Sequence, residues 1–131
     1  MATTRYIKPT ESELEILQVL WKKGLATVRE VHEDLAALKD AGYTTTLKLM
    51  QIMNEKGLVK RDEKSRAHIY RAAIAQEHTQ KGLVKDLLDK AFRGSALRLV
   101  QHVLETKPAS REELAEIKRM IAEAEAREES K

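Results

Sequence analysis

Apolar residues recur every three or four positions in two runs of the N-terminal sequence, and each run predicts an amphipathic helix. The first run, "TESELEILQVLWKK", has an apolar face of Leu14, Leu17, Val19, Leu20 and Trp21. The second, "TVREVHEDLAALKDAG", has one of Val28, Val31, Leu35 and Leu38. Each opens with a capping box, in which a threonine and a glutamate three residues later satisfy each other's backbone N–H groups. Gly24 and Gly42 are the predicted helix ends.

A third helix is predicted over Thr45–Lys56, with Gly57 as its end. At about 100° per residue its buried side comprises Thr46, Leu49, Met50 and Met53. The opposite side comprises Thr44, Lys48, Gln51 and Glu55, with Leu47 and Ile52 on the flanks. Three consecutive threonines therefore lie at the start of a helix with a polar outer face, although threonine is a mediocre helix former.

The spacing of the apolar residues changes after this helix. Two short strand-like runs, 58–61 and 67–71, flank the polar turn "DEKS" and predict a β-hairpin. From residue 76 the period is helical again, in three stripes. Their apolar residues are Leu83, Val84, Leu87, Leu88 and Ala91; Leu97, Val100, Val103 and Leu104; and Leu114, Ile117, Ile121 and Ala124. We expect a mainly α protein with two domains: a winged helix-turn-helix domain of three helices plus a β-hairpin wing (1–75), and an α-helical dimerisation domain (76–131).

The composition narrows the function. The chain of 131 residues has no cysteine, which excludes disulfides, cysteine-ligated metals and cysteine nucleophiles. No uncharged apolar stretch approaches the roughly 18 residues that span a bilayer, and "MATTRYIKPT" lacks the apolar run of a signal peptide. We expect a cytoplasmic protein with no membrane insertion.

The positive charge is concentrated in one segment. Residues 43–75 carry seven basic and three acidic side chains, whereas residues 1–42 carry six and seven, and residues 76–131 carry eleven of each. A local basic excess on a helix-turn-helix pattern predicts a double-stranded DNA partner.

In a helix-turn-helix the last helix enters the major groove N-terminus first. Threonine hydroxyls and free N–H groups at that end suit phosphate oxygens, lysine suits guanine acceptors, glutamine suits adenine, and apolar side chains suit thymine methyls. Basic side chains on the wing suit the phosphates of the neighbouring DNA backbone. The predicted DNA-binding residues are Thr44, Thr45, Thr46, Leu47, Lys48, Gln51 and Ile52 on the helix and Lys60, Arg61, Lys64, Arg66 and His68 on the wing.

Two other function classes compete with DNA binding. An enzyme is not favoured, because the four histidines form no spaced ligand set and no phosphate loop, activated serine or converging carboxylate pair is present; we expect no metal and no cofactor. A winged helix that docks proteins without binding DNA stays an alternative. Charge distinguishes it, because a docking module does not need a basic wing.

The C-terminal stripes predict a homodimer, since three short helices bury too little alone to form a comfortable monomeric core. The predicted dimerisation residues are Leu83, Leu87, Leu97, Val100, Val103, Leu104, Leu114, Ile117 and Ile121.

In combination, "TESELEILQVLWKKGLATVREVHEDL", "YTT", "EKGLV" and "RAHIYRA" resemble the BlaI/MecI family of penicillinase repressors. The later "GSALRLVQHVLE" and "SREELAEIKRMI" resemble the family's C-terminal dimerisation segment. The resemblance implies a homodimeric repressor that binds an inverted-repeat operator and controls β-lactamase, penicillin-binding-protein or other stress genes.

Two departures from the family are visible. Related copper-responsive repressors carry C-terminal cysteine pairs, and this chain has none. In staphylococcal-type repressors a membrane sensor triggers cleavage at an Asn-Phe bond, a place that His102-Val103 occupies here. That bond is the candidate regulatory cleavage point, and a membrane sensor protease or another inducing protease is the partner that the resemblance implies.

Overall fold

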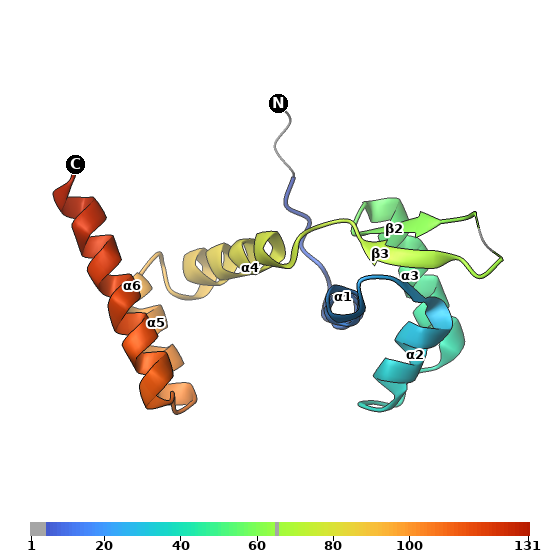
Figure 1. Cartoon of the computed structure of the whole chain (residues 1–131), viewed down its shortest axis with the longest axis horizontal. Coiled ribbons are helices and arrows are strands. Elements are labelled where there is room, and N and C mark those ends of the chain that lie inside the picture. The colour runs from blue at the N-terminus through green and yellow to red at the C-terminus, as the bar shows by residue number, and fades with distance from the viewer. Residues whose placement is uncertain (1–4, 65) are drawn as a thin grey trace. The chain divides into compact units, whose positions relative to one another are not determined.

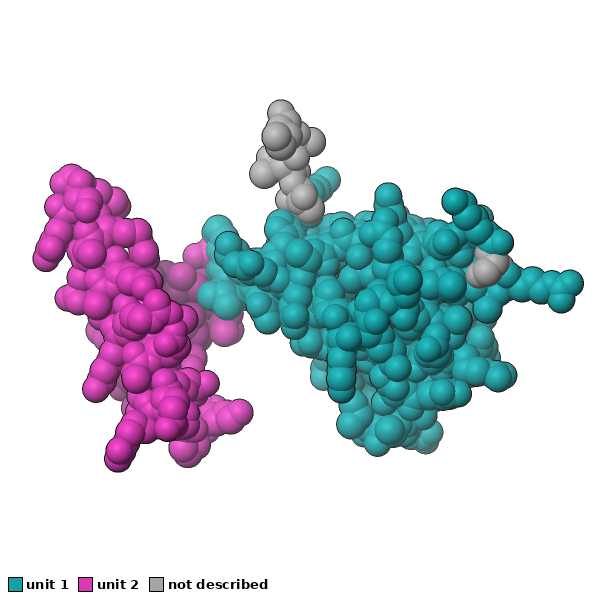
Figure 2. Space-filling view, in the orientation of Figure 1, with its two compact units in different colours: residues 1–86 teal, residues 87–131 magenta. Residues whose placement is uncertain are grey.

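A computed structural model describes residues 5–64 and 66–131 of the chain. Their contacts divide the chain into two compact units, residues 1–86 and 87–131 (Figure 2). Ser65, the last residue of the predicted "DEKS" turn, lies outside the described residues.

The first unit is a winged helix (Figure 1). Its elements are α1 (Glu11–Lys23), β1 (Ala26–Thr27), α2 (Val28–Ala36), α3 (Tyr43–Lys56), β2 (Val59–Asp62), β3 (Ile69–Ala72) and the first part of α4 (Gln76–Ala91). The strands form an antiparallel sheet in the order β1-β3-β2. Tyr70 on β3 pairs with Ala26 on one side and Arg61 on the other. The mainly α winged-helix prediction is confirmed, and the hairpin is its wing.

One aliphatic core joins the three helices to the sheet. The buried apolar side chains are Ile16, Leu17, Leu20, Ala26, Val28, Val31, Leu35, Met50, Met53, Leu58, Val59, Tyr70 and Ile74. Burying each large aliphatic side chain contributes about 1.5–3 kcal/mol. This core fixes α3 with its polar side outward.

The predicted end of the second helix was wrong. The helix ends at Ala36 with Ala37 as its C-cap, and the N–H group of Leu38 turns back to the carbonyl of Leu35, three residues earlier, in a tighter turn than that of an α-helix. Leu38 is 84% exposed instead of lying on the buried face. Gly42 is the N-cap of α3, which begins at Tyr43 rather than Thr45.

The buried face of α1 also differs from the prediction. Glu13 and Ile16 are fully buried, whereas Leu14 and Val19 are only half-buried. Glu13 is inside because it accepts a hydrogen bond from the Thr10 N–H (2.9 Å) and pairs with Lys56 at the end of α3 (2.7 Å).

The first part of α4 packs within unit 1, beyond the predicted domain boundary at 75/76. The Trp21 indole N–H donates to the carbonyl of Ile74 (2.9 Å), and Thr79 is buried. Tyr6 lies so close to Gly82 that a Cβ there would be 2.1 Å from its ring. These contacts explain why the compact unit runs to residue 86.

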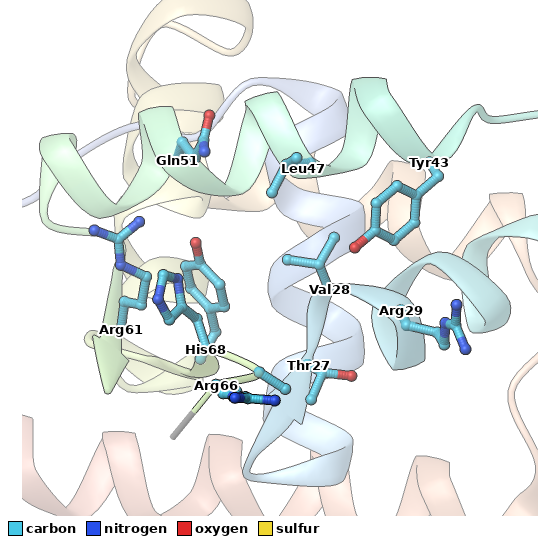
Figure 3. A pocket seen from close by; sticks show the side chains of 11 residues that line it. Thr27, Val28, Arg29, Tyr43, Leu47, Gln51, Arg61, Arg66 and His68 are labelled. Atoms are coloured by element: carbon cyan, nitrogen blue, oxygen red, sulfur yellow. The ribbon is translucent and has the colours of Figure 1, made fainter. Parts of the chain in front are cut away.

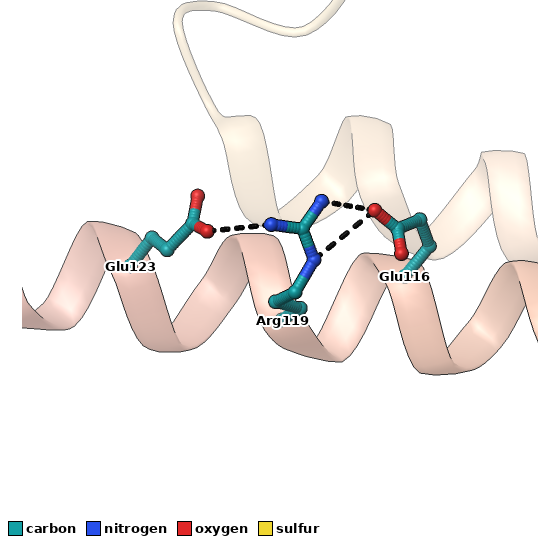
Figure 4. Close-up of polar contacts among 3 residues, drawn as sticks. All are labelled: Glu116, Arg119 and Glu123. Atoms are coloured by element: carbon teal, nitrogen blue, oxygen red, sulfur yellow. Dashed lines mark hydrogen bonds and ion pairs between the residues drawn. The ribbon is translucent and has the colours of Figure 1, made fainter.

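The second unit comprises the end of α4, α5 (Ala96–Thr106) and α6 (Arg111–Glu129). Neither α5 nor α6 has a buried residue. On α6, Arg119 donates to both Glu116 and Glu123, an exposed ladder that stabilises the helix itself (Figure 4). Within the described part of the chain, no helix is both long enough and apolar enough to cross a membrane.

Candidate nucleic-acid interface

The N-terminal end of α3 is open to solvent. Its N-cap, Gly42, has no side chain that could accept hydrogen bonds from the N–H groups of the first turn. Thr44 and Thr45 are exposed beside these groups. An uncapped helix start with two exposed hydroxyls suits a phosphate oxygen.

Thr46 must be removed from the predicted interface. Its side chain is 2% exposed and its hydroxyl donates to the carbonyl of Gly42 (3.3 Å). The third threonine therefore supports the start of α3 from inside.

The outer face of α3 carries the predicted base-reading side chains. Lys48 and Gln51 are exposed, and neither has an ion-pair or side-chain hydrogen-bond partner among the described residues. Leu47 and Ile52 are half-buried, with Leu47 packed against the core. Lys48 and Gln51 are therefore the freer groups on this face.

A cleft of about 460 Å³ lies between α3, the wing and the start of α2. In Figure 3, Arg61, Arg66 and His68 come from the hairpin, while Leu47 and Gln51 come from α3. The full lining is Thr27, Val28, Arg29, Tyr43, Leu47, Gln51, Arg61, Arg66, Ala67, His68 and Tyr70. The cleft brings residues of the predicted helix and wing sets together.

Six lining residues were not predicted from the sequence, and Arg29 and Tyr43 are the two of these with exposed side chains that could bind a ligand. Arg29 lies on the first turn of α2, where it is exposed and has no partner among the described residues. Tyr43 is the first residue of α3, and its ring meets His32 edge-on at 5.7 Å. Arg29 lies in a segment of slightly negative net charge, so only the fold reveals that it shares a cleft with the wing.

The wing cations differ in their surroundings. The side chains of Lys60, Lys64, Arg66 and His68 are exposed and have no partner in the described part of the chain. Arg61 is half-buried and pairs with Glu63. Hydrogen bonds with Tyr70 and then Glu63 raise the pKa of Arg61 above its already high value. The described part of the wing therefore carries four unpartnered side chains, those of three cations and one histidine, beside one arginine that is paired with an acid.

Similarity to known proteins identifies the family. The sequence model described as "Penicillinase repressor" matches residues 9–123.

This protein belongs to the penicillinase repressor family.

Its relatives are transcription regulators. "Transcriptional regulator BlaI" of Mycobacterium tuberculosis is 34% identical over 116 residues, covering 87% of this chain and 83% of that protein. "Methicillin resistance regulatory protein MecI" of Staphylococcus aureus is 20% identical over 112 residues, covering 86% and 91%. A solved structure of a Lactococcus lactis ZitR mutant matches with a TM-score of 0.44 and 14% identity, over 96% of this chain and 80% of that one. The family is one of transcriptional repressors.

The predicted dimerisation residues of this repressor-family protein are mostly solvent-exposed. Leu97 is 80% exposed, and only Leu83 and Ile117 are half-buried. The others, with exposures of 39–57%, are Leu87, Val100, Val103, Leu104, Leu114 and Ile121. Met120, at 56%, was missed from the sequence. An apolar stripe is thus available on the second unit.

His102-Val103 lies inside α5. The carbonyl of His102 accepts a hydrogen bond from the Thr106 hydroxyl (2.6 Å), and its ring contacts Phe92 at 5.7 Å. Cleavage of this bond would require this turn of α5 to unwind. The bond is still only a predicted cleavage point. Among the described residues, no group of three or more histidine and acidic side chains is placed to hold a metal ion.

Proposed function

We propose that this protein is a sequence-specific DNA-binding repressor that acts as a homodimer on an inverted-repeat operator. One observation carries the proposal: the unpartnered polar face of α3 opens beside a cleft lined by arginines of α2 and the wing. Family membership supports it, since the family is one of transcriptional repressors.

In this proposal α3 enters the major groove N-terminus first. Thr44, Thr45 and the free N–H groups of the first turn would meet a phosphate. Lys48 would reach guanine N7 and O6, and Gln51 would bind adenine N6 and N7. The half-buried Leu47 and Ile52 would offer only an apolar edge to a thymine methyl.

The wing would track the neighbouring backbone. Lys60, Lys64, Arg66 and His68 are exposed and free to follow phosphates. Arg29 would add a backbone contact from the opposite wall of the cleft. These contacts give affinity and salt dependence but little sequence preference.

Two copies would join through the exposed stripe of the second unit. A two-fold dimer would place its α3 helices on half-sites about 34–36 Å apart, or a multiple of this. We expect target genes of the β-lactamase or penicillin-binding-protein type, since the family is that of the penicillinase repressors.

The test uses the full-length protein and two duplexes: one selected by the protein from a random library, and one of random sequence. Gln51→Ala should weaken binding to the selected duplex by about 1–3 kcal/mol and leave binding to the random duplex nearly unchanged, because glutamine is uncharged. As the contrasting control, Lys64→Ala should weaken binding to both duplexes equally. It should also reduce the slope of log affinity against log salt concentration by about one unit.

Equal losses on both duplexes for Gln51→Ala would show that α3 does not read bases. If the library yields no selected sequence and the wild-type protein shows no salt-dependent binding to duplex DNA, the proposal fails and protein docking becomes the function to pursue.

A further inference from the structure

One of the basic side chains of the wing is already paired with an acidic side chain. Arg61 is on β2 and Glu63 is the first residue beyond that strand. Residues two apart on an extended chain point to the same side, so the Glu63 carboxylate meets the Arg61 guanidinium directly. Glu63 itself is 62% exposed.

Arg61 is well placed to take part in the interface. It lines the cleft with Gln51 and also a second pocket of about 340 Å³ with Lys60 and Lys64. Its side chain is 24% exposed, and its guanidinium meets the Glu63 carboxylate. The Arg61 side chain is thus partly buried at the interface, with Glu63 on its guanidinium.

The neighbouring turn keeps Glu63 in place. The Asp62 carboxylate accepts a hydrogen bond from the Lys64 N–H (2.9 Å), which closes the chain around residue 63. Among the described wing cations, Arg61 alone is paired with an acid; Lys60, Lys64 and Arg66 are not.

We propose that Glu63 occupies on Arg61 the place of a DNA phosphate, so that Glu63 competes with the DNA backbone for this guanidinium. A carboxylate and a phosphate both present two oxygens to the same donor fork. This inference rests on the proposed function, because it assigns a regulator to the same interface. It makes Glu63 a residue that lowers affinity for all DNA without changing sequence preference.

The main variant is Glu63→Gln, which keeps the size of the side chain and removes the charge. Affinity for the selected and the random duplex should rise by the same factor, roughly two- to fivefold for an exposed ion pair. The gain should be largest at low salt, because added salt screens the competing pair. The matched control is Glu33→Gln on α2, which removes the same charge from an exposed acid that lies outside the cleft and should change nothing.

A double-mutant cycle separates competition for Arg61 from diffuse repulsion of DNA. In an Arg61→Gln background the gain from Glu63→Gln should disappear, since there is no guanidinium left to free. Arg61→Met, which keeps the apolar stem, replaces Arg61→Gln if that variant does not fold. A gain that persists without Arg61 overturns the inference, as does an unchanged affinity of Glu63→Gln at low salt. If the wild-type protein binds neither duplex, the proposed function fails instead.

Discussion

At the scale of single residues, Glu13 is the unusual group of the fold. Its carboxylate is 2% exposed, and Lys56 on the far end of α3 reaches it over 2.7 Å. Burial acts to raise the pKa of Glu13, but the hydrogen bonds from Lys56 and the Thr10 N–H outweigh it and hold the pKa below its ordinary value. The pair therefore ties the start of α1 to the end of the helix that we propose reads DNA.

Lys56→Met should destabilise the protein at neutral pH by about 1–3 kcal/mol, because it leaves a buried carboxylate without its cation. Lys56 is itself 40% exposed, which keeps the loss below that of a fully buried pair. The matched control is Lys39→Met, whose pair with Glu15 is half-exposed on both sides and should cost about 0–1 kcal/mol. Urea unfolding of both variants measures the difference.

The same comparison has a pH signature. Because the folded-state pKa of Glu13 is depressed, its stabilising contribution is present above the unfolded value of about 4.3 and is lost as pH falls through the folded value. The unfolded-state titration is common to both proteins, so the difference in stability between wild type and Lys56→Met should shrink as the pH falls and Glu13 is protonated in the folded state, first in the variant and then in the wild type. If the difference in the free energy of unfolding stays constant from neutral to strongly acidic pH, Lys56 acts through packing alone.

At the scale of elements, local chemistry predicted the starts of α1 and α2 and the ends of α1 and α3, but not the end of α2 or the start of α3. The capping boxes at Thr10 and Thr27 form as the sequence predicts, because cap and glutamate are three residues apart. The end of α2 depends on turn hydrogen bonds that no local pattern announces. The two-residue strand β1 was also missed, since it exists only by pairing with β3.

The candidate site divides in the same way. Lys48 and Gln51 follow from helical periodicity, because a free outer face is a property of one element. Arg29 joins them only through the packing of α2 against α3, which the sequence does not display. Tyr43 lies one turn before Leu47 on α3 and was missed because the helix was predicted to begin at Thr45. The burial of Thr46 was visible in the periodicity and should have outweighed its hydroxyl.

One element contact can be tested alone. Gly82 lies within α4, and its missing side chain makes room for the ring of Tyr6. In an isolated helix Gly→Ala is worth up to about 1 kcal/mol of stabilisation. Here we expect Gly82→Ala to destabilise, because the ring must leave its place.

The control removes the ring. In a Tyr6→Ala background, Gly82→Ala should become stabilising by up to about 1 kcal/mol, since only helix propensity remains. Thermal unfolding of the four proteins gives the coupling. A stabilising Gly82→Ala in the wild-type background would show that the Tyr6 ring moves aside at no cost.

At the scale of the whole molecule, charge and apolar surface are found in different parts of the chain. The basic excess lies in residues 43–75, within the winged helix, whereas most of the exposed large apolar side chains among the described residues lie on α5 and α6, in the part of the chain where the charges balance. Contiguous apolar surface of this kind marks a protein contact. This separation supports the proposal that the first unit binds DNA and the second joins two copies.

Val100→Asp should convert a homodimer to monomers that keep a folded winged helix, because Val100 is exposed on α5 and contributes nothing to the core of the first unit. Leu38→Asp is the matched control: it puts the same charge on an exposed leucine outside the stripe and should leave the dimer intact. Sedimentation velocity at micromolar concentration measures the mass. Loss of the dimer in Val100→Asp should also lower the affinity for the selected duplex, because a single winged helix would read only one half-site. A wild-type protein that sediments at 14.9 kDa would refute the dimer, and the stripe would then need another partner.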